Sequence, residues 1–421
     1  MYYVYSATNP SPTMSSKQNY NPNASASMLG YIYQVQYALY MCLEMLTKID
    51  DPDEHNISLE KLDDIAFDQN GSVSFVNQIK GHDLIESEDA VENLTDRSSD
   101  IWSTFRVWVK LINDGDAKLG KTVFRLITTQ SYSQVSVASY LSDTKDRDPA
   151  EALKLLQEIS TETSNKTNKE AYEAFQSLSP AQLNIFIDSV YMIGQSEDID
   201  EINQKISRYC RQYVARNKAT PFAERLNGKW NELCTSSLQK NPTGVINLGE
   251  VQALIDSFRP EYRDDNLPAE FADNLPKAIN INKDNRKFVQ QLRLINLPNI
   301  FIKSAIIDYF QSFKQRDKWA ADGLLNPGEL GKYDRRLIRK WAEFREEVEM
   351  LEPHNTEEEK LRAAYQLYKK CRSEGTLPIR RDFIEEYVAK GSYHMLSDDQ
   401  KIGWHFNYLD YLKAQEEDDA A

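Results

Sequence analysis

The sequence contains no long apolar run, since no segment of the 421 residues approaches the length of about 18 apolar residues that a membrane-spanning helix needs. We therefore expect no membrane span. Residues 1–26 also lack the basic segment followed by an apolar core that marks a secretory signal. They are rich in Asn, Ser and Pro instead, which predicts a flexible leader.

Cysteine is scarce and widely spaced. The four cysteines form no CxxC pair, and they are Cys42, Cys210, Cys234 and Cys371. This spacing argues against a zinc site or a disulfide framework. It is typical of a reduced, cytoplasmic protein, which is the compartment we expect.

Positive charge is in deficit, with 50 Lys and Arg against 65 Asp and Glu and a formal net charge of −15. Domains that bind DNA are usually basic, because contacts to phosphates supply most of the affinity. DNA binding by this chain should therefore depend on another subunit or on further copies of itself. The hydrophobic fraction of 41% and the chain length predict two or three globular domains.

The N-terminal half reads as one α/β unit with a mixed sheet. Residues 28–49 have apolar residues at helical spacing, and an amphipathic helix is predicted over 98–114, where Ile101, Phe105 and Trp108 share a stripe. Strands are predicted at 57–62, 64–68, 72–80 and 121–129, with Asn70-Gly71 as a hairpin turn. The predicted order is helix, three strands, helix, strand.

The rest of the chain is predicted to be mainly helical. Residues 147–240 are charged with a helical period, 246–284 are punctuated by Pro, Asn and Gly, and 285–421 return to long helical patterns. We therefore predict a leader over 1–26, a catalytic α/β domain over 27–245 with its core at 28–145, a linker over 246–284, and a helical C-terminal domain over 285–421.

The hairpin DDIAFDQNGSVSFVNQIK at residues 63–80 carries the strongest candidate site. Side chains alternate faces along a strand, so Asp64, Gln78 and Lys80 can share one face. Glu60 could join them from the preceding strand. Asp63 and Asn77 are expected on the other side, and a plain surface hairpin is the competing interpretation.

These residue types suit phosphodiester hydrolysis. Asp64 can supply a carboxylate and Gln78 an amide oxygen to Mg²⁺ or Mn²⁺, the hard cations that prefer oxygen ligands. Such a metal lowers the pKa of an attacking water. Lys80 can orient the water and balance the developing charge.

The pattern resembles the D…(D/E/Q)xK arrangement of the restriction-endonuclease-like, or PD-(D/E)xK, superfamily, although no Pro precedes the acidic pair and Gln replaces the commoner acid. Residues 28–240 resemble, more narrowly, the double-stranded DNA endonuclease effectors of CBASS operons. The motifs that carry this resemblance are Gly30–Gln34, Glu60 with Asp63-Asp64-Ile65, Gln78-Ile79-Lys80, Leu94-Thr95 with Trp102, and Leu126–Thr129. The resemblance implies that Asp64, Gln78 and Lys80 are active-site residues, with Gln34 and Glu60 as supporting positions.

The C-terminal half resembles the C-terminal domain of ABC three-component systems, through Gly391–His394 and Gly403–His405 above all. These are Lamassu-type defence operons, and the joined architecture resembles their nuclease subunit. The resemblance implies an antiphage or antiplasmid effector that cuts double-stranded DNA. The implied partners are an SMC-like ATPase and a small third subunit, with self-association in the active form.

Other polar groups have plainer interpretations. His82 is expected to be an exposed loop residue, and His394 and His405 are more plausibly packing residues beside Tyr393, Trp404, Phe406 and Tyr408 than a zinc pair. The Arg335-Arg336 and Arg380-Arg381 pairs are expected in protein contacts or on solvated faces. Four basic residues near the candidate site in sequence could contact phosphates, namely Lys110, Lys118, Lys121 and Arg125. A non-catalytic scaffold that bridges DNA to the ATPase is the alternative function.

Overall fold

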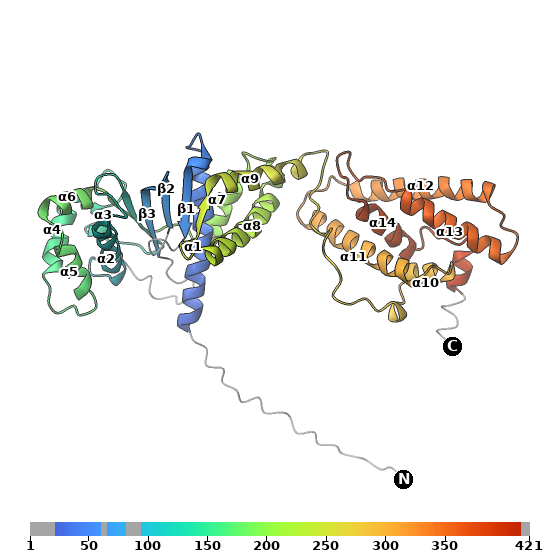
Figure 1. Cartoon of the computed structure of the whole chain (residues 1–421), viewed down its shortest axis with the longest axis horizontal. Coiled ribbons are helices and arrows are strands. Elements are labelled where there is room, and N and C mark those ends of the chain that lie inside the picture. The colour runs from blue at the N-terminus through green and yellow to red at the C-terminus, as the bar shows by residue number, and fades with distance from the viewer. Residues whose placement is uncertain (1–21, 60–64, 81–93, 414–421) are drawn as a thin grey trace, which may run out of the picture. The chain divides into compact units, whose positions relative to one another are not determined.

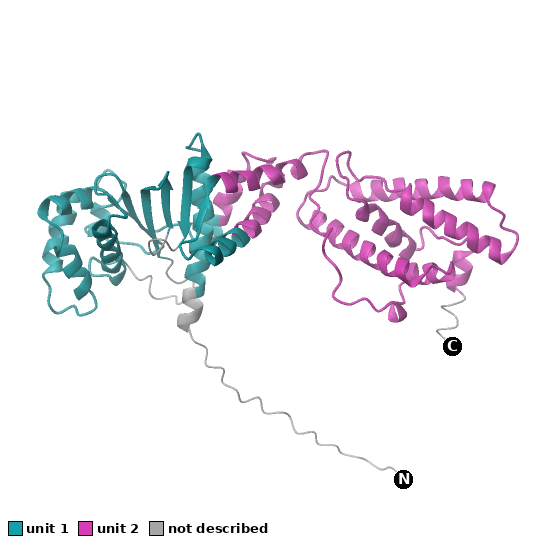
Figure 2. Cartoon of the chain, in the orientation of Figure 1, with its two compact units in different colours: residues 1–202, 231–248 teal, residues 203–230, 249–421 magenta. Residues whose placement is uncertain are grey.

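The computed structural model describes residues 22–59, 65–80 and 94–413. They form two compact units, of which unit 1 comprises residues 1–202 with 231–248 and unit 2 comprises 203–230 with 249–421 (Figure 2). The chain thus crosses between units more than once. The boundary predicted at residue 245 stays a prediction.

Unit 1 is built on a six-stranded mixed sheet in the order β5-β4-β3-β2-β1-β6 (Figure 1). The three strands β3, β4 and β5 are parallel, and the remaining neighbours are antiparallel. The strands are β1 His55–Leu59, β2 Ile65–Gln69, β3 Ser72–Lys80, β4 Val123–Thr128, β5 Val190–Ile193 and β6 Val245–Asn247. Among the described elements, the order α1-β1-β2-β3-α2-β4 is the one predicted, and the mixed α/β class is confirmed.

The predicted hairpin turn joins β2 to β3. Asn70 and Gly71 have φ angles of 50° and 79°, the positive values that a tight hairpin turn requires at both positions. The Asp68 carboxylate accepts hydrogen bonds from the Gly71 backbone N–H at 3.0 Å and from Asn56 Nδ2 at 3.1 Å. Asp68 therefore stabilises the turn, at the end of β3 opposite to Lys80.

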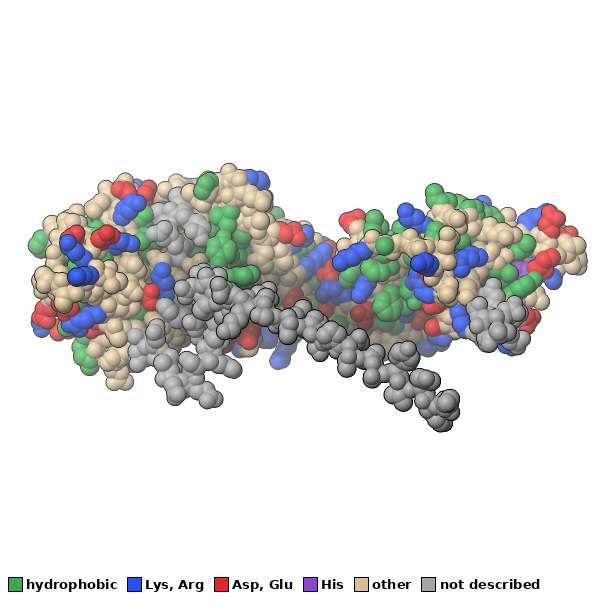
Figure 3. Space-filling view, turned by 90° about the horizontal axis from the view of Figure 1, so that it is seen from below, with side chains coloured by type: hydrophobic (Ala, Val, Ile, Leu, Met, Phe, Trp, Pro, Cys, Tyr) green, Lys and Arg blue, Asp and Glu red, His purple; other side chains and the backbone are tan. Residues whose placement is uncertain are grey.

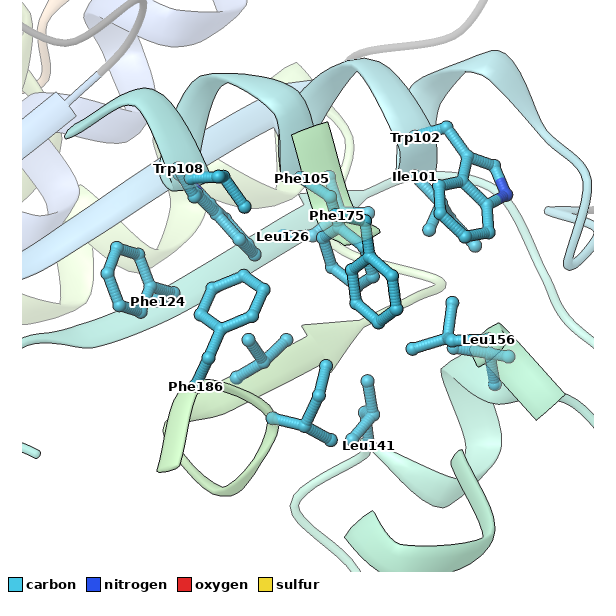
Figure 4. Close-up of a cluster of buried hydrophobic side chains, with 14 of the residues drawn as sticks. Ile101, Trp102, Phe105, Trp108, Phe124, Leu126, Leu141, Leu156, Phe175 and Phe186 are labelled. Atoms are coloured by element: carbon cyan, nitrogen blue, oxygen red, sulfur yellow. The ribbon is translucent and has the colours of Figure 1, made fainter. Parts of the chain in front are cut away.

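A large aromatic core covers the face of the sheet that bears Val76, Phe124 and Leu126 (Figure 4). Helix α2 (Ser99–Asp114) buries the predicted stripe of Ile101, Phe105 and Trp108 there. The Trp108 and Phe124 rings lie 5.3 Å apart between centroids. The layer is completed by α3 Val137–Tyr140, α4 Pro149–Ser160, α5 Lys169–Gln176 and α6 Pro180–Asp188. This packing fixes the side from which Gln78 and Lys80 project.

Two short strands interrupt segments that were predicted to be helical or irregular. β5 lies within residues 147–240, and β6 with α9 (Leu248–Phe258) lies at and beyond residue 245. α7 (Ile199–Cys210) and α8 (Ala219–Lys240) are helical as expected. Strands of 4 and 3 residues carry too little alternation to be recognised from sequence.

The described residues beyond 285 form a helical array in unit 2, as predicted. It contains α10 Lys287–Leu294, α11 Asn299–Ala321, α12 Glu329–Leu351, α13 Glu357–Ser373 and α14 Glu386–Asp398. Helices α11 and α14 pack closely at Gly391, where an added Cβ would lie 2.0 Å from the Asp308 carbonyl oxygen. No helix among the described residues is long and apolar enough to cross a membrane.

Candidate active site

Gln78 and Lys80 end the central strand β3 on the face covered by α2. Gln78 is paired with Leu126 of β4 and Lys80 with Thr128, and Leu126 belongs to the aromatic core. They share the face of Val76, which is paired with Ala66 in β2. The predicted co-facial placement of Gln78 and Lys80 is therefore confirmed, and they lie at the carboxyl ends of the parallel strands.

The acidic part of the predicted set cannot be placed. Asp64 and Glu60 lie outside the described residues, as does His82. Their roles stay predictions.

Gln78 is a buried polar residue of the sheet with an oxygen unsatisfied by the described residues, as are Ser58 and Asn77. Its side chain is only 4% exposed, and its Oε1 accepts no hydrogen bond from any described residue. A buried acceptor without a partner costs about 1–3 kcal/mol, so such atoms need a reason to persist. A cation at this position would supply the missing partner. Gln78, the predicted metal ligand that lies within the described residues, therefore has an oxygen available to a cation.

Gln34, predicted as a supporting residue, contacts the same strand end. Its Nε2 donates to the Ile79 carbonyl oxygen at 3.3 Å, from α1 (Pro22–Leu46). β2 begins with Ile65, which pairs with Asn77 of β3, so the bond to Ile79 lies beyond the described β2–β3 pairing. Gln34 therefore holds the backbone between Gln78 and Lys80.

A second set of contacts at this edge was not predicted. The Tyr33 hydroxyl donates to the Glu197 carbonyl oxygen at 2.8 Å, and the Ser196 N–H donates to the Thr128 carbonyl oxygen at 2.9 Å. These bonds connect α1, the segment after β5 and the residue paired with Lys80. Burial raises the pKa of Tyr33 to about 12, so the hydroxyl stays protonated as a donor.

Gln130 is a further buried amide near this edge. It is 6% exposed, its N–H donates to Thr128 Oγ1 at 3.2 Å, and its Oε1 has no hydrogen-bond donor among the described residues. Only its position two residues beyond a strand end could have drawn attention to it in the sequence.

The sheet register corrects the expected closeness of Lys118, Lys121 and Arg125 to the site, while their contact with phosphates stays a prediction. β3 and β4 are parallel, with Phe75 paired to Val123 and Lys80 to Thr128. At about 3.3 Å per residue these pairs are roughly 16 Å apart, so Lys118 and Lys121, which precede Val123, lie towards the opposite end of β4. Arg125 is paired with Asn77 and so projects from the other face, where its guanidinium lies 4.5 Å from the Phe75 ring centroid. Proximity in sequence was misleading here.

No group of three or more His, Cys, Asp or Glu side chains that could hold a metal occurs within the described residues. His394 is 3% exposed with its ring 6.3 Å from that of Trp404, and Arg380 forms a part-buried ion pair with Glu329 at 2.8 Å. The predicted structural roles of both are confirmed.

On the face of unit 1 drawn in Figure 3, Lys and Arg side chains are interspersed with Asp and Glu.

Comparison with known families bears on the C-terminal region. Residues 288–412 match the family model of C-terminal domain 7 of the ABC-three component (ABC-3C) systems. This confirms the coarser part of the resemblance noted from the sequence, namely similarity to ABC-three component systems. The match lies within the predicted C-terminal domain.

Solved structures give a weak likeness. The chain is similar to the Acinetobacter baumannii Cap4 SAVED/CARF-domain containing receptor with the cyclic trinucleotide 2'3'3'-cAAA, at 12% identity and a TM-score of 0.30, over 68% of this chain and 66% of that one. A further structure of the Acinetobacter baumannii Cap4 SAVED/CARF-domain containing receptor matches at 13% identity and a TM-score of 0.30, over 67% of this chain and 61% of that one. The chain thus spans 66% or less of these proteins. No curated protein matches it significantly.

Proposed function

We propose that the protein is a metal-dependent DNA endonuclease and the effector of an antiphage ABC-three component system of the Lamassu type. The observation that carries the catalytic part is the placement of Gln78 and Lys80 together, with the Gln78 Oε1 buried and without a donor among the described residues. The family match at residues 288–412 supports the system.

Each residue would have a separate task. Gln78 and Asp64 would hold Mg²⁺ or Mn²⁺, which supplies a water of lowered pKa and polarises the phosphoryl oxygen when bound. Lys80 would orient the attacking water and balance the charge that develops on the phosphate. Gln34 would keep the β3 backbone in place through the Ile79 carbonyl.

A plasmid-cleavage assay tests this proposal, with the protein assembled with its operon partners and with Mg²⁺ compared against EDTA. Lys80→Ala should lose cleavage by a factor of about 100 or more while folding and assembly remain intact. The matched control is Lys121→Ala, an exposed lysine towards the opposite end of the neighbouring strand. Cleavage by Lys80→Ala at the parental rate would overturn the assignment.

The second candidate is a non-catalytic scaffold that binds DNA and bridges it to the ATPase. The net charge of −15 and the neutral Gln78 in place of an acid favour it. It requires that the assembled protein bind DNA and leave it intact with Mg²⁺.

An adjacent gene for an SMC-like ATPase would support Lamassu, whereas a nucleotidyltransferase neighbour would favour CBASS.

A further inference from the structure

Two adjoining cavities in unit 2 carry an unusual concentration of arginine for so acidic a chain. One, of about 530 Å³, lies between residues 211–215 after α7 and residues 256–264 around the end of α9. The other, of about 430 Å³, lies between α7 and α8. Arg211 lines both, so the two cavities are neighbours on this side of unit 2. We call the two together the arginine groove, lined by Arg208, Arg211, Arg259 and Arg263.

Most of the acid in the larger cavity is already neutralised. Asp256 accepts from Arg259 at 3.1 Å and Asp264 from Lys218 at 2.7 Å. Within the described part of the chain, neither Arg211 nor Arg263 forms an ion pair, and both are exposed. Glu224 is the acid that lines the smaller cavity, opposite Arg208 and Arg211. The pair with Asp256 also neutralises Arg259, so the positive excess of the groove rests on Arg211 and Arg263.

Two tyrosines that line the larger cavity, Tyr213 and Tyr262, pack on Phe222. Phe222 is fully buried, and its ring lies 5.2 Å from that of Tyr262 and 6.4 Å from that of Tyr213. Lys218, itself 5% exposed, donates to the Tyr262 carbonyl oxygen at 3.0 Å. These contacts join the segment after α7, which carries Arg211, to the segment after α9, which carries Arg263.

We propose that the arginine groove binds the phosphodiester backbone of DNA. The guanidinium group presents paired N–H donors that match phosphate oxygens, and it carries its charge at every physiological pH. An open groove with arginines spread along two cavities suits a row of phosphates better than one enclosed anion. Local positive charge of this kind attracts a polyanion even on a protein of negative net charge.

The proposal rests on the proposed function in taking DNA as the substrate, and it adds a binding surface outside unit 1. It explains how a chain with a charge of −15 could grip DNA. Because the groove needs no metal and no cleavage, it can be tested separately from catalysis.

The test measures binding of a short fluorescent duplex by anisotropy, using the full chain with Lys80→Ala in EDTA over a range of salt concentrations. The double variant Arg211→Ala with Arg263→Ala should bind more weakly, and the slope of log affinity against log salt should fall by about 2. The control double variant is Arg335→Ala with Arg339→Ala, which removes equal charge from exposed positions on α12. Its slope should remain parental.

Several outcomes would overturn the proposal. They are a parent that binds no duplex at low salt, a groove variant with the parental slope, and a control with the same loss as the groove variant. Displacement of the duplex by inorganic phosphate, at concentrations too low to change ionic strength, would assign the groove to free phosphate instead. If duplex binding depends on the groove but the assembled protein never cleaves, only the nuclease proposal fails.

Discussion

At the scale of single residues, a substitution at Gln78 can distinguish a metal-binding role of this side chain from a purely structural one. Its buried Oε1 has no donor among the described residues, so the side chain costs stability where it stands. A residue kept for packing alone would be replaced to advantage by an apolar side chain of similar size.

Gln78→Leu should therefore abolish metal-dependent DNA cleavage while the free energy of unfolding stays level or rises by about 1 kcal/mol. Chemical denaturation and the plasmid assay measure the two effects. Gln291→Leu is the control, because that amide is 1% exposed and donates from Nε2 to the Ser397 carbonyl oxygen at 2.9 Å. It should lose about 1–3 kcal/mol. A comparable loss in Gln78→Leu would make Gln78 a structural residue.

Sequence reasoning located part of the site because strand parity is a short-range property. The spacing of Gln78 and Lys80 is enough to put them on one face, and the register confirms it. Tyr33, Ser196 and Gln130 could not be found in this way. The Tyr33 hydroxyl reaches Glu197 across 164 residues, and Ser196 and Gln130 are bonded to Thr128 and Gln195 on different segments, so no local pattern encodes these contacts.

At the scale of elements, two helical glycines of unit 2 should respond oppositely to the same substitution. An added Cβ at Gly391 would lie 2.0 Å from the Asp308 carbonyl oxygen of α11, whereas nothing lies within 4 Å at Gly228 of α8. The first glycine permits a close helix crossing. The second only lowers helix propensity.

We expect Gly391→Ala to lower the free energy of unfolding by about 1–3 kcal/mol and Gly228→Ala to raise it by about 1 kcal/mol. Thermal and urea unfolding measure both. Equal effects of the two substitutions would mean that the α11–α14 crossing can open without cost.

Prediction of the elements succeeded where they were long or sharply punctuated. Helix α2 has a continuous apolar stripe, and the Asn70-Gly71 turn is specified by two adjacent residues. β5 and β6 were missed because their pairing, rather than their composition, makes them strands. The segment of Val190 lies in a charged, helical part of the sequence, and only its pairing with Phe124 of β4 makes it a strand.

At the scale of the whole molecule, each unit has its own core, so heating should unfold the chain in two transitions.

The units should also differ in acid sensitivity. Burial, assisted by Arg372 and Arg286, lowers the pKa of His394 in unit 2 to about 3. Burial lowers the pKa of His405 in the same unit too, although Glu357 opposes the shift.

Below about pH 6.5 the unfolded chain binds a proton that folded His394 rejects, so stability falls as the pH falls. The transition of unit 2 should lose about 1.4 kcal/mol per pH unit from this residue between about pH 6 and pH 4. Calorimetry over this range measures it. His394→Leu should flatten the dependence, whereas His354→Leu, at an exposed position, should not. An unchanged slope in His394→Leu would contradict the prediction.

The last strand of the sheet has a consequence for synthesis. β6 pairs with β1, and Asn247 Nδ2 donates to Asn56 Oδ1 at 3.1 Å across 191 residues of chain. At usual translation rates, β1 of a nascent chain would wait roughly 10–40 s for this neighbour to be made. Throughout that interval its outer backbone groups would be open to pairing with another polypeptide. During synthesis the risk of aggregation therefore lies at the β1 edge of the sheet. It ends only when residues 245–247 emerge from the ribosome and pair with β1.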